Sequence, residues 1–256
     1  MATDDSSSGP ILGEKTGKFP IRIEGEVHTF HYPERPHLRD MSVEIMEGKT
    51  YPLPGLADFT PSLIVDIGAG IGAAAFYFHG RFPDARIHCY EPLPENYSYL
   101  ERNVAPFPNV TPHACGLYDR EAEAEIYAGK VHPYQSSIIK SAETGAASQK
   151  IKLERTADEF RRIGAGNISI LKVDTEGCEV PIVSDALEAA HNIDLLYVEY
   201  HAEDDRLALD RILSPRFLLG YSKALKPHRG ECAYVSKTLA SRYPGTAMYE
   251  LTRPEM

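Results

Sequence analysis

The chain has 256 residues, of which 43% are hydrophobic and 25% are charged, a composition typical of a globular protein that buries a full core. Its 37 Asp and Glu residues against 27 Lys and Arg residues give a formal net charge of −10, which argues against an extended nucleic-acid footprint. No run approaches the ~18 consecutive apolar residues of a membrane-spanning helix. The polar, acidic N-terminus does not have the pattern of a secretory signal. We therefore expect a cytoplasmic protein with no nucleic-acid partner and no membrane span, and the sequence leaves the oligomeric state open.

The domain organisation follows from composition and from the spacing of the cysteines. Residues 1–18 are polar and predict a disordered N-terminal tail. Residues 19–256 predict one domain, with its core at about 41–237. The four cysteines are far apart and form no C-x-x-C pair, so they predict reduced thiols and neither a disulfide nor a zinc framework.

From residue 63 onward, short apolar runs alternate with longer amphipathic runs. The apolar runs predict strands at residues 63–66, 86–90, 110–114, 168–173, 193–200, 217–221 and 232–235. The amphipathic runs predict a helix that runs towards residue 79 and further helices at 94–103, 179–190 and 204–213. This alternation indicates an α/β fold with a doubly wound, mainly parallel sheet. Residues 124–127 and 150–153 alternate polar and apolar side chains, which predicts added antiparallel or edge strands.

A glycine-rich turn follows the first of these strands, in the order Asp66-Ile67-Gly68-Ala69-Gly70-Ile71-Gly72. Glycines at such a turn permit positive φ angles and let a ligand approach the backbone. Glu91 ends the next strand and precedes Pro92. A carboxylate at that place can accept hydrogen bonds from the ribose hydroxyls of an adenosine.

The turn fits more than one cofactor. Gly68, Gly70 and Ala73 match the G-x-G-x-x-A fingerprint of dinucleotide-binding proteins, so an NAD(P)-dependent oxidoreductase is an alternative. A non-catalytic nucleotide-binding module is another possible interpretation of the turn. Asp66 favours S-adenosylmethionine as the cofactor. The ammonium and sulfonium groups of S-adenosylmethionine are cationic, whereas the carboxylate of Asp66 would repel the pyrophosphate of a dinucleotide. The sequence also lacks an evident Ser/Tyr/Lys catalytic set, which an oxidoreductase would need.

Four longer segments carry a family resemblance. They are VDIGAGIG (65–72), FPDARIHCYEPLPENYSYLERN (82–103), LKVDTEGCE (171–179) and VEYH (198–201). In this order and spacing the sequence resembles the FkbM-type S-adenosylmethionine-dependent methyltransferases over about residues 42–237. The resemblance implies a class I, Rossmann-like methyltransferase fold with a seven-stranded sheet and an antiparallel edge strand. It also implies methyl transfer to a hydroxyl oxygen of a small-molecule natural product, a sugar or a glycolipid.

The resemblance also implies which residues bind the cofactor. By motif match these are Asp66, Gly68, Ala69, Gly70, Glu91 and Pro92, with Cys115 and Gly116 near the adenine. Gly70 stands where the family often has Asn, and we expect this change to leave the turn intact. Tyr51 precedes the first strand of the resemblance, and its ring is predicted to lie against the sulfonium or to be a packed aromatic.

The acceptor side is predicted from the ends of two strands. Asp174 and Glu176 follow the strand at 168–173, and Glu199 and His201 end the strand at 193–200. We expect these four residues to be catalytic, with His201 or Asp174 as the proton acceptor and the two glutamates orienting the acceptor or the loop.

Other roles for these residues stay open. Asp174 also suits support of the cofactor or of the turn, and Glu176 suits a charge at the start of a helix. The carboxylates of Asp174, Glu176 and Glu199 could also hold Mg²⁺. No dense motif of metal ligands supports this, so we predict no metal. The polar loop at 134–138 is a candidate lid over the acceptor.

Overall fold

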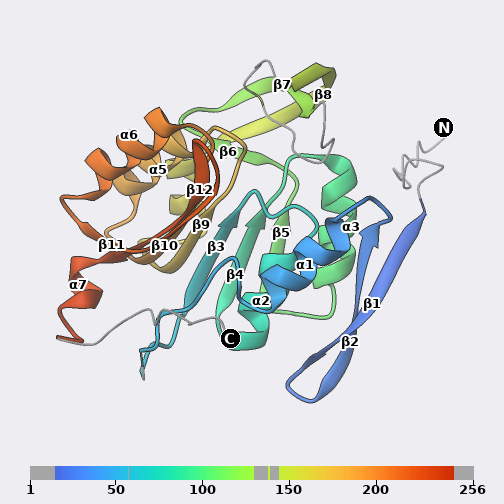
Figure 1. Cartoon of the computed structure of the whole chain (residues 1–256), viewed down its shortest axis with the longest axis horizontal. Helices are drawn as coiled ribbons and strands as arrows, with labels where there is room; N and C mark the ends of the chain where they lie inside the picture. Colours follow the sequence, from blue (N-terminus) through green and yellow to red (C-terminus); the bar gives the residue numbers. More distant parts are fainter. Residues whose placement is uncertain (1–14, 57, 130–137, 139–143, 245–256) are drawn as a thin grey trace, which may run out of the picture.

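The computed structural model describes residues 15–56, 58–129, 138 and 144–244. Its centre is a seven-stranded sheet with the strand order β11-β12-β10-β9-β3-β4-β5, flanked by helices (Figure 1). The strands of this sheet are β3 (Leu63–Ile67), β4 (Arg86–Tyr90), β5 (Val110–His113), β9 (Asn167–Val173), β10 (Asn192–Tyr200), β11 (Phe217–Lys226) and β12 (Arg229–Ser236). The helices are α1 (Leu38–Met46), α2 (Ala73–Arg81), α3 (Pro94–Val104), α4 (Thr156–Arg162), α5 (Glu179–Ala189), α6 (Glu203–Leu213) and α7 (Lys237–Ala240).

The pairing of the strands confirms the predicted α/β, doubly wound and mainly parallel sheet. Strands β10, β9, β3, β4 and β5 pair in parallel, whereas β12 runs antiparallel to both β10 and β11. The antiparallel strand is therefore not at the edge, where we had predicted it. Because β11 and β12 form a hairpin whose second strand pairs with β10, β11 becomes the edge strand.

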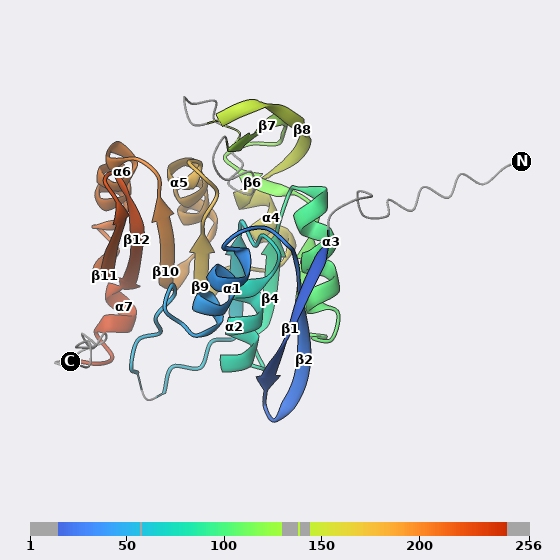
Figure 2. The same ribbon diagram turned by 45° about the vertical axis from the view of Figure 1, so that its right-hand side comes forward.

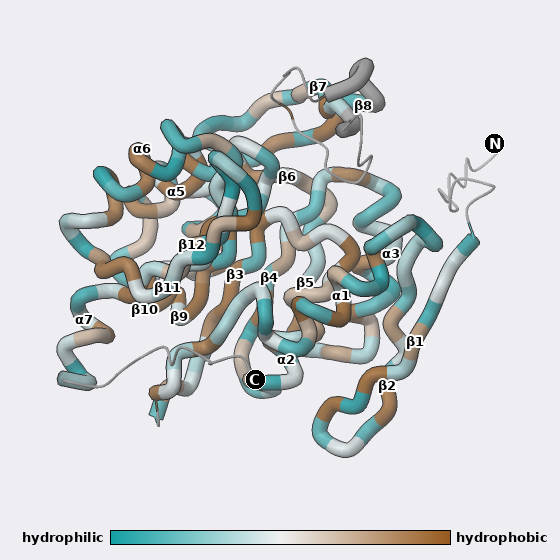
Figure 3. The backbone as a smooth tube through the Cα atoms, viewed as in Figure 1, coloured by the Kyte–Doolittle hydropathy of each residue, from teal (hydrophilic) through white to brown (hydrophobic). Residues whose placement is uncertain are grey.

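Both faces of the sheet are buried under helices. Successive residues of a strand point to opposite faces, so Ile64 belongs to a core under α1, α2 and α3, and Val65 belongs to a core under α4, α5 and α6. Figure 2 shows the two sets of helices on either side of the sheet. The hydrophobic colour of β3 and β9 in Figure 3 reflects this double burial, which is typical of parallel strands.

An N-terminal hairpin, which the sequence analysis did not predict, packs on the first of these cores. It consists of β1 (Thr16–Ile23) and β2 (Glu26–Pro33). Phe30 of β2 contacts Phe76 of α2, with 5.1 Å between the ring centroids. Because β1 begins at Thr16, the predicted tail of residues 1–18 extends too far, and residues 1–14 lie outside the described part of the chain.

The alternating segments form a second, smaller sheet. Strands β7 (Ala122–Gly129) and β8 (Thr144–Arg155) pair antiparallel, as predicted, and β6 (Gly116–Tyr118) joins β8 in parallel. Figure 1 shows this three-stranded sheet beyond the carboxyl ends of β3 and β4. Within the described ranges, no helix has the length and apolar character needed to cross a membrane.

Asn103 ties the hairpin to the central domain. It lies on α3 and is 1% exposed. Its Oδ1 accepts a hydrogen bond from the N–H of His31, and its Nδ2 donates to the carbonyls of His31 and Ile71, each at 2.8 Å.

We predict that Asn103→Ala lowers the free energy of unfolding by about 2–4 kcal/mol, because these buried backbone groups lose their hydrogen-bond partner. Denaturant unfolding measures this. Glu101→Ala, on the exposed face of α3, is the control and should change stability by less than about 0.5 kcal/mol, so equal losses in both variants would contradict the prediction.

Candidate active site

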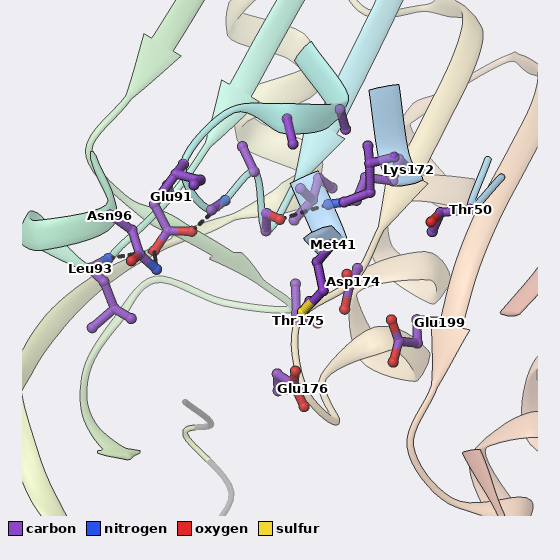
Figure 4. Close-up of a pocket in the computed structure, with 18 of the residues that line it drawn as sticks. Met41, Thr50, Glu91, Leu93, Asn96, Lys172, Asp174, Thr175, Glu176 and Glu199 are labelled. Carbon is purple, nitrogen blue, oxygen red and sulfur yellow. Dashed lines mark hydrogen bonds between the residues drawn. The ribbon is translucent and has the colours of Figure 1, made fainter. Parts of the chain in front are cut away.

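A cavity of about 400 Å³ lies at the carboxyl ends of the central parallel strands (Figure 4). Its walls come from the glycine-rich turn after β3, the segment after β4, the segment after β9, the ends of β10 and β12, helix α1 and the small sheet. Ligands of open α/β sheets bind at this edge. The cavity therefore lies at the edge of the sheet from which the acceptor side was predicted, and Asp174, Glu176 and Glu199 line it.

The glycine-rich turn is shaped by close backbone contacts. The N–H groups of Gly68 and Ala69 both donate to the carbonyl of Tyr90, at 3.0 Å. Gly68 has a φ of 76°, and a Cβ there would lie 1.8 Å from the carbonyl oxygen of Asp174, so no other residue fits. Gly70 has a φ of 56°, but its Cβ position has no heavy atom within 4 Å. Its backbone therefore faces open space that a ligand can occupy.

Glu91, the predicted ribose-binding carboxylate, lies against this turn. Its carboxylate accepts hydrogen bonds from the N–H of Gly70 at 2.8 Å, the N–H of Leu93 at 2.9 Å and the amide of Asn96 at 3.5 Å. It is 5% exposed and lines the cavity, and burial raises the pKa of Glu91 to about 7. A carboxylate has about four lone-pair sites, so these contacts leave capacity for a ligand hydroxyl.

Asp66, predicted to contact the cofactor, lies behind the cavity wall. It is 0% exposed and is not one of the residues that line the cavity. It instead forms an ion pair with Lys172, with 2.9 Å between Oδ1 and Nζ, and neither of its oxygens accepts a well-directed hydrogen bond within the described chain. Lys172 does line the cavity, and its Nζ donates to the carbonyl of Gly68 at 2.6 Å. Lys172 was not among the site residues predicted from the sequence, although a lysine within a buried strand is a signal for one.

Asp174 and Tyr51 meet on the cavity wall. The hydroxyl of Tyr51 donates to Oδ2 of Asp174 at 3.5 Å, and burial raises the pKa of both groups. The Tyr51 ring also packs edge-on against Tyr197, with 5.5 Å between centroids. The Nζ atom of Lys172 lies 5.8 Å from the centre of the Tyr51 ring. Tyr51 is thus both a packed aromatic and a cavity residue, and the cation beside its ring is a lysine of the chain itself.

Glu176 and Glu199 are held together by Arg229 of β12. Arg229 donates from Nε to Glu199 at 2.6 Å and from Nη2 to Glu176 at 3.1 Å. All three residues line the cavity. Burial and the nearby Asp174 raise the pKa of Glu199 to about 8. Arg229 was missed, because its position opposite these acids depends on the hairpin.

His201 lies behind this group and does not line the cavity. Its Nε2 is 3.0 Å from Glu176, and its Nδ1 is 3.2 Å from the fully buried Glu179. Burial lowers the pKa of an imidazole, but these two carboxylates outweigh it and raise the pKa of His201 to about 11. A protonated imidazole has no lone pair with which to accept a proton. The predicted role of His201 as the base therefore does not fit its surroundings.

His201 also belongs to a group of potential metal ligands. Ligand atoms of Asp174, Glu179 and His201 lie within 4.8 Å of one another. A metal at this place would have to displace the proton that Glu176 and Glu179 favour on the imidazole of His201.

The remaining predicted residues divide in two. Ala69, Pro92 and Gly116 line the cavity, whereas Cys115 does not, and burial raises the pKa of its thiol to about 11. Of the candidate lid, residues 134–137 lie outside the described residues, and Ile138 lines the cavity.

Glu231 of β12 is a further cavity residue that the sequence analysis missed. It pairs with Glu199 across the strands and is 7% exposed. Burial raises the pKa of Glu231 to about 7. Its Oε2 has no hydrogen-bond partner in the described part of the chain. Its place follows from the register of β10 and β12, and no motif marks it.

Comparisons with known proteins agree with this geometry. The family model described as the methyltransferase FkbM domain matches residues 66–222. The chain belongs to the FkbM methyltransferase family. This membership supports a methyltransferase over the oxidoreductase alternative.

Individual relatives are more distant. Methyltransferase sdnD of Sordaria araneosa is 25% identical over 195 residues, which cover 64% of this chain and 74% of that protein. Methyltransferase 1 of Beauveria bassiana is 24% identical over 160 residues, which cover 55% of this chain and 64% of that protein. Among solved structures, the fibrillarin pre-rRNA processing protein of Methanococcus jannaschii aligns with a TM-score of 0.50 at 12% identity, over 90% of this chain and 86% of that one. This likeness confirms the class I methyltransferase fold and nothing finer.

The two glycines of the turn give a matched test. We predict that Gly68→Ala lowers the free energy of unfolding by more than about 4 kcal/mol, because its Cβ meets a backbone oxygen at 1.8 Å. Gly70→Ala, with a similar φ and open space, should cost only about 1–2 kcal/mol. Thermal or denaturant unfolding of both variants measures the difference. Similar losses would show that φ, and not the contact with Asp174, constrains the turn.

The charge on His201 predicts a pH dependence of stability. Its folded pKa, about 11, lies above the ordinary value of 6.5, so its contribution is complete below pH 6.5 and falls as the pH rises towards 11. The gap in unfolding free energy between wild type and His201→Gln should therefore shrink between pH 7 and 10, by up to about 1.4 kcal/mol per pH unit. Urea unfolding at several pH values measures it. A gap that stays constant or widens would mean that His201 is neutral in the folded protein.

Proposed function

We propose that the chain transfers a methyl group from S-adenosylmethionine to a hydroxyl oxygen of a small-molecule natural product, a sugar or a glycolipid. One observation carries the proposal. A single cavity joins the glycine-rich turn and Glu91 to the half-buried carboxylate of Asp174. Such a cavity can hold an adenosine-bearing cofactor at one end and an acceptor at the other.

The residues present fit the cofactor. Glu91 would hold the ribose hydroxyls, and the open backbone at Gly70 leaves room for the ligand to approach. Leu93 of the segment after β4, together with Ile151 and Leu153 of β8, supplies an apolar wall on the same side. When bound, the cofactor supplies a methyl carbon made electrophilic by the adjoining sulfonium.

On the acceptor side, we assign Asp174 as the group that accepts the hydroxyl proton. Tyr51 orients its carboxylate, and burial raises its pKa, which strengthens it as a base. Arg229 fixes Glu176 and Glu199 beside it. His201, held between Glu176 and Glu179, acts as a positioning residue.

The carboxyl groups around the acceptor end favour a hydroxylated molecule. Glu199 and Glu231 face each other on adjacent strands and both line the cavity. A carboxyl group can form hydrogen bonds with a ligand hydroxyl in either protonation state. The unpartnered Oε2 of Glu231 supports the same conclusion.

Calorimetric titration with S-adenosylhomocysteine and with NAD tests the cofactor. We predict binding of S-adenosylhomocysteine and no tight binding of NAD. Glu91→Gln should weaken S-adenosylhomocysteine binding by about 10- to 100-fold, because a charged acceptor of ribose hydroxyls is lost. Glu44→Gln, which changes a cavity carboxylate near Glu231, is the control and should keep the wild-type affinity. Tight NAD binding, or an unchanged affinity in Glu91→Gln, would refute the assignment.

Transfer of a labelled methyl group to a hydroxylated small-molecule extract tests the base. We predict that Asp174→Asn lowers kcat by about 10²- to 10⁴-fold and leaves S-adenosylhomocysteine affinity unchanged, because only the proton acceptor is removed. His201→Gln is the comparison and should lose less activity. If Asp174→Asn keeps wild-type turnover, Asp174 is not the base.

A further inference from the structure

Lys172 is a cavity residue that the proposed chemistry does not yet use. Its side chain is only 4% exposed, although it forms part of the cavity wall (Figure 4). Two contacts hold its ammonium group, an ion pair with the carboxylate of Asp66 at 2.9 Å and a hydrogen bond to the carbonyl of Gly68 at 2.6 Å. An ammonium has three N–H groups. These two contacts therefore leave capacity for a third acceptor.

Neighbouring carboxylates favour the charged form of the Lys172 ammonium. Asp66 lies beside it with a wholly buried side chain that does not line the cavity. Burial would lower the pKa of a lysine, but Asp66 and Asp174 outweigh it and raise the pKa of Lys172 above its usual value. A buried ion pair adds little stability compared with two packed apolar residues. Besides joining β3 and β9, this cation on the cavity wall can therefore serve an anionic ligand group.

The position of Lys172 selects which ligand group this is. Its contact with Gly68 attaches it to the turn on the cofactor side, whose Gly70 contacts Glu91. S-adenosylmethionine and S-adenosylhomocysteine each carry one anionic group, the α-carboxylate of the amino-acid end. We propose that Lys172 binds this α-carboxylate, an inference that rests on the proposed function. Lys172 is then a residue that positions the cofactor through its amino-acid end.

Two ligands that differ only in the carboxylate provide the test. They are S-adenosylhomocysteine and its decarboxylated form, S-adenosyl-3-thiopropylamine, and calorimetry measures the affinity of each. We expect the wild type to bind S-adenosylhomocysteine about 10- to 100-fold more tightly than the decarboxylated ligand, because one charge-assisted hydrogen bond is lost. Lys172→Met should abolish this preference by weakening the binding of S-adenosylhomocysteine alone.

A charge-neutral double variant and a control lysine complete the test. The double variant Asp66→Asn with Lys172→Met removes both charges, so it avoids an uncompensated buried carboxylate and should show the same loss of preference. Lys223→Met changes another lysine of the cavity wall, on β11, and should keep the wild-type ratio.

The outcomes separate this inference from the proposed function. If the wild type binds neither adenosyl ligand, both are wrong. If it binds both ligands with equal affinity, the inference alone is overturned. It is also overturned if Lys172→Met and the double variant weaken both ligands by the same factor, because Lys172 then only supports the shape of the turn.

Discussion

The ion pair between Asp66 and Lys172 is the interaction on which the site depends. The two residues are register partners on β3 and β9, and both side chains are almost completely buried. Removing either partner would leave an uncompensated buried charge, which costs about 3–5 kcal/mol. Because Lys172 also bonds the carbonyl of Gly68, the same pair joins two central strands to the glycine-rich turn. The contact of Gly68 with the Asp174 backbone then links the turn to the acceptor side.

Burial and pairing together set the chemistry of the cavity. Parallel strands end at one edge of a sheet, so Glu91, Asp174 and Glu199 meet there although they are far apart in sequence. Their pKa values are raised chiefly by burial, to about 7 for Glu91 and about 8 for Glu199. Arg229 and His201 supply positive charge on the outer side of this group. The carboxylates are thereby held at fixed positions while a ligand hydroxyl can still reach them.

The sequence predicted the strands and site residues that a local pattern of side chains specifies. The apolar runs located β3, β4, β9 and β10, and the family motifs located the turn, Glu91 and Asp174. It did not predict what depends on tertiary register. Arg229 and Glu231 face the site only because β12 inserts beside β10, and His201 is charged only because Glu176 and Glu179 fold around it. The short, polar α4 and the half-exposed hairpin of β1 and β2 carry weak periodicity, so they were missed as well.

The central claim is that one cavity binds an adenosyl cofactor through Glu91 and the glycine-rich turn. A crystal structure of the chain with S-adenosylhomocysteine tests it most directly. Our account predicts that the ribose hydroxyls contact the Glu91 carboxylate and that the sulfur faces the side of the cavity formed by Asp174. A ligand bound outside this cavity, or one whose ribose lies away from Glu91, would contradict it.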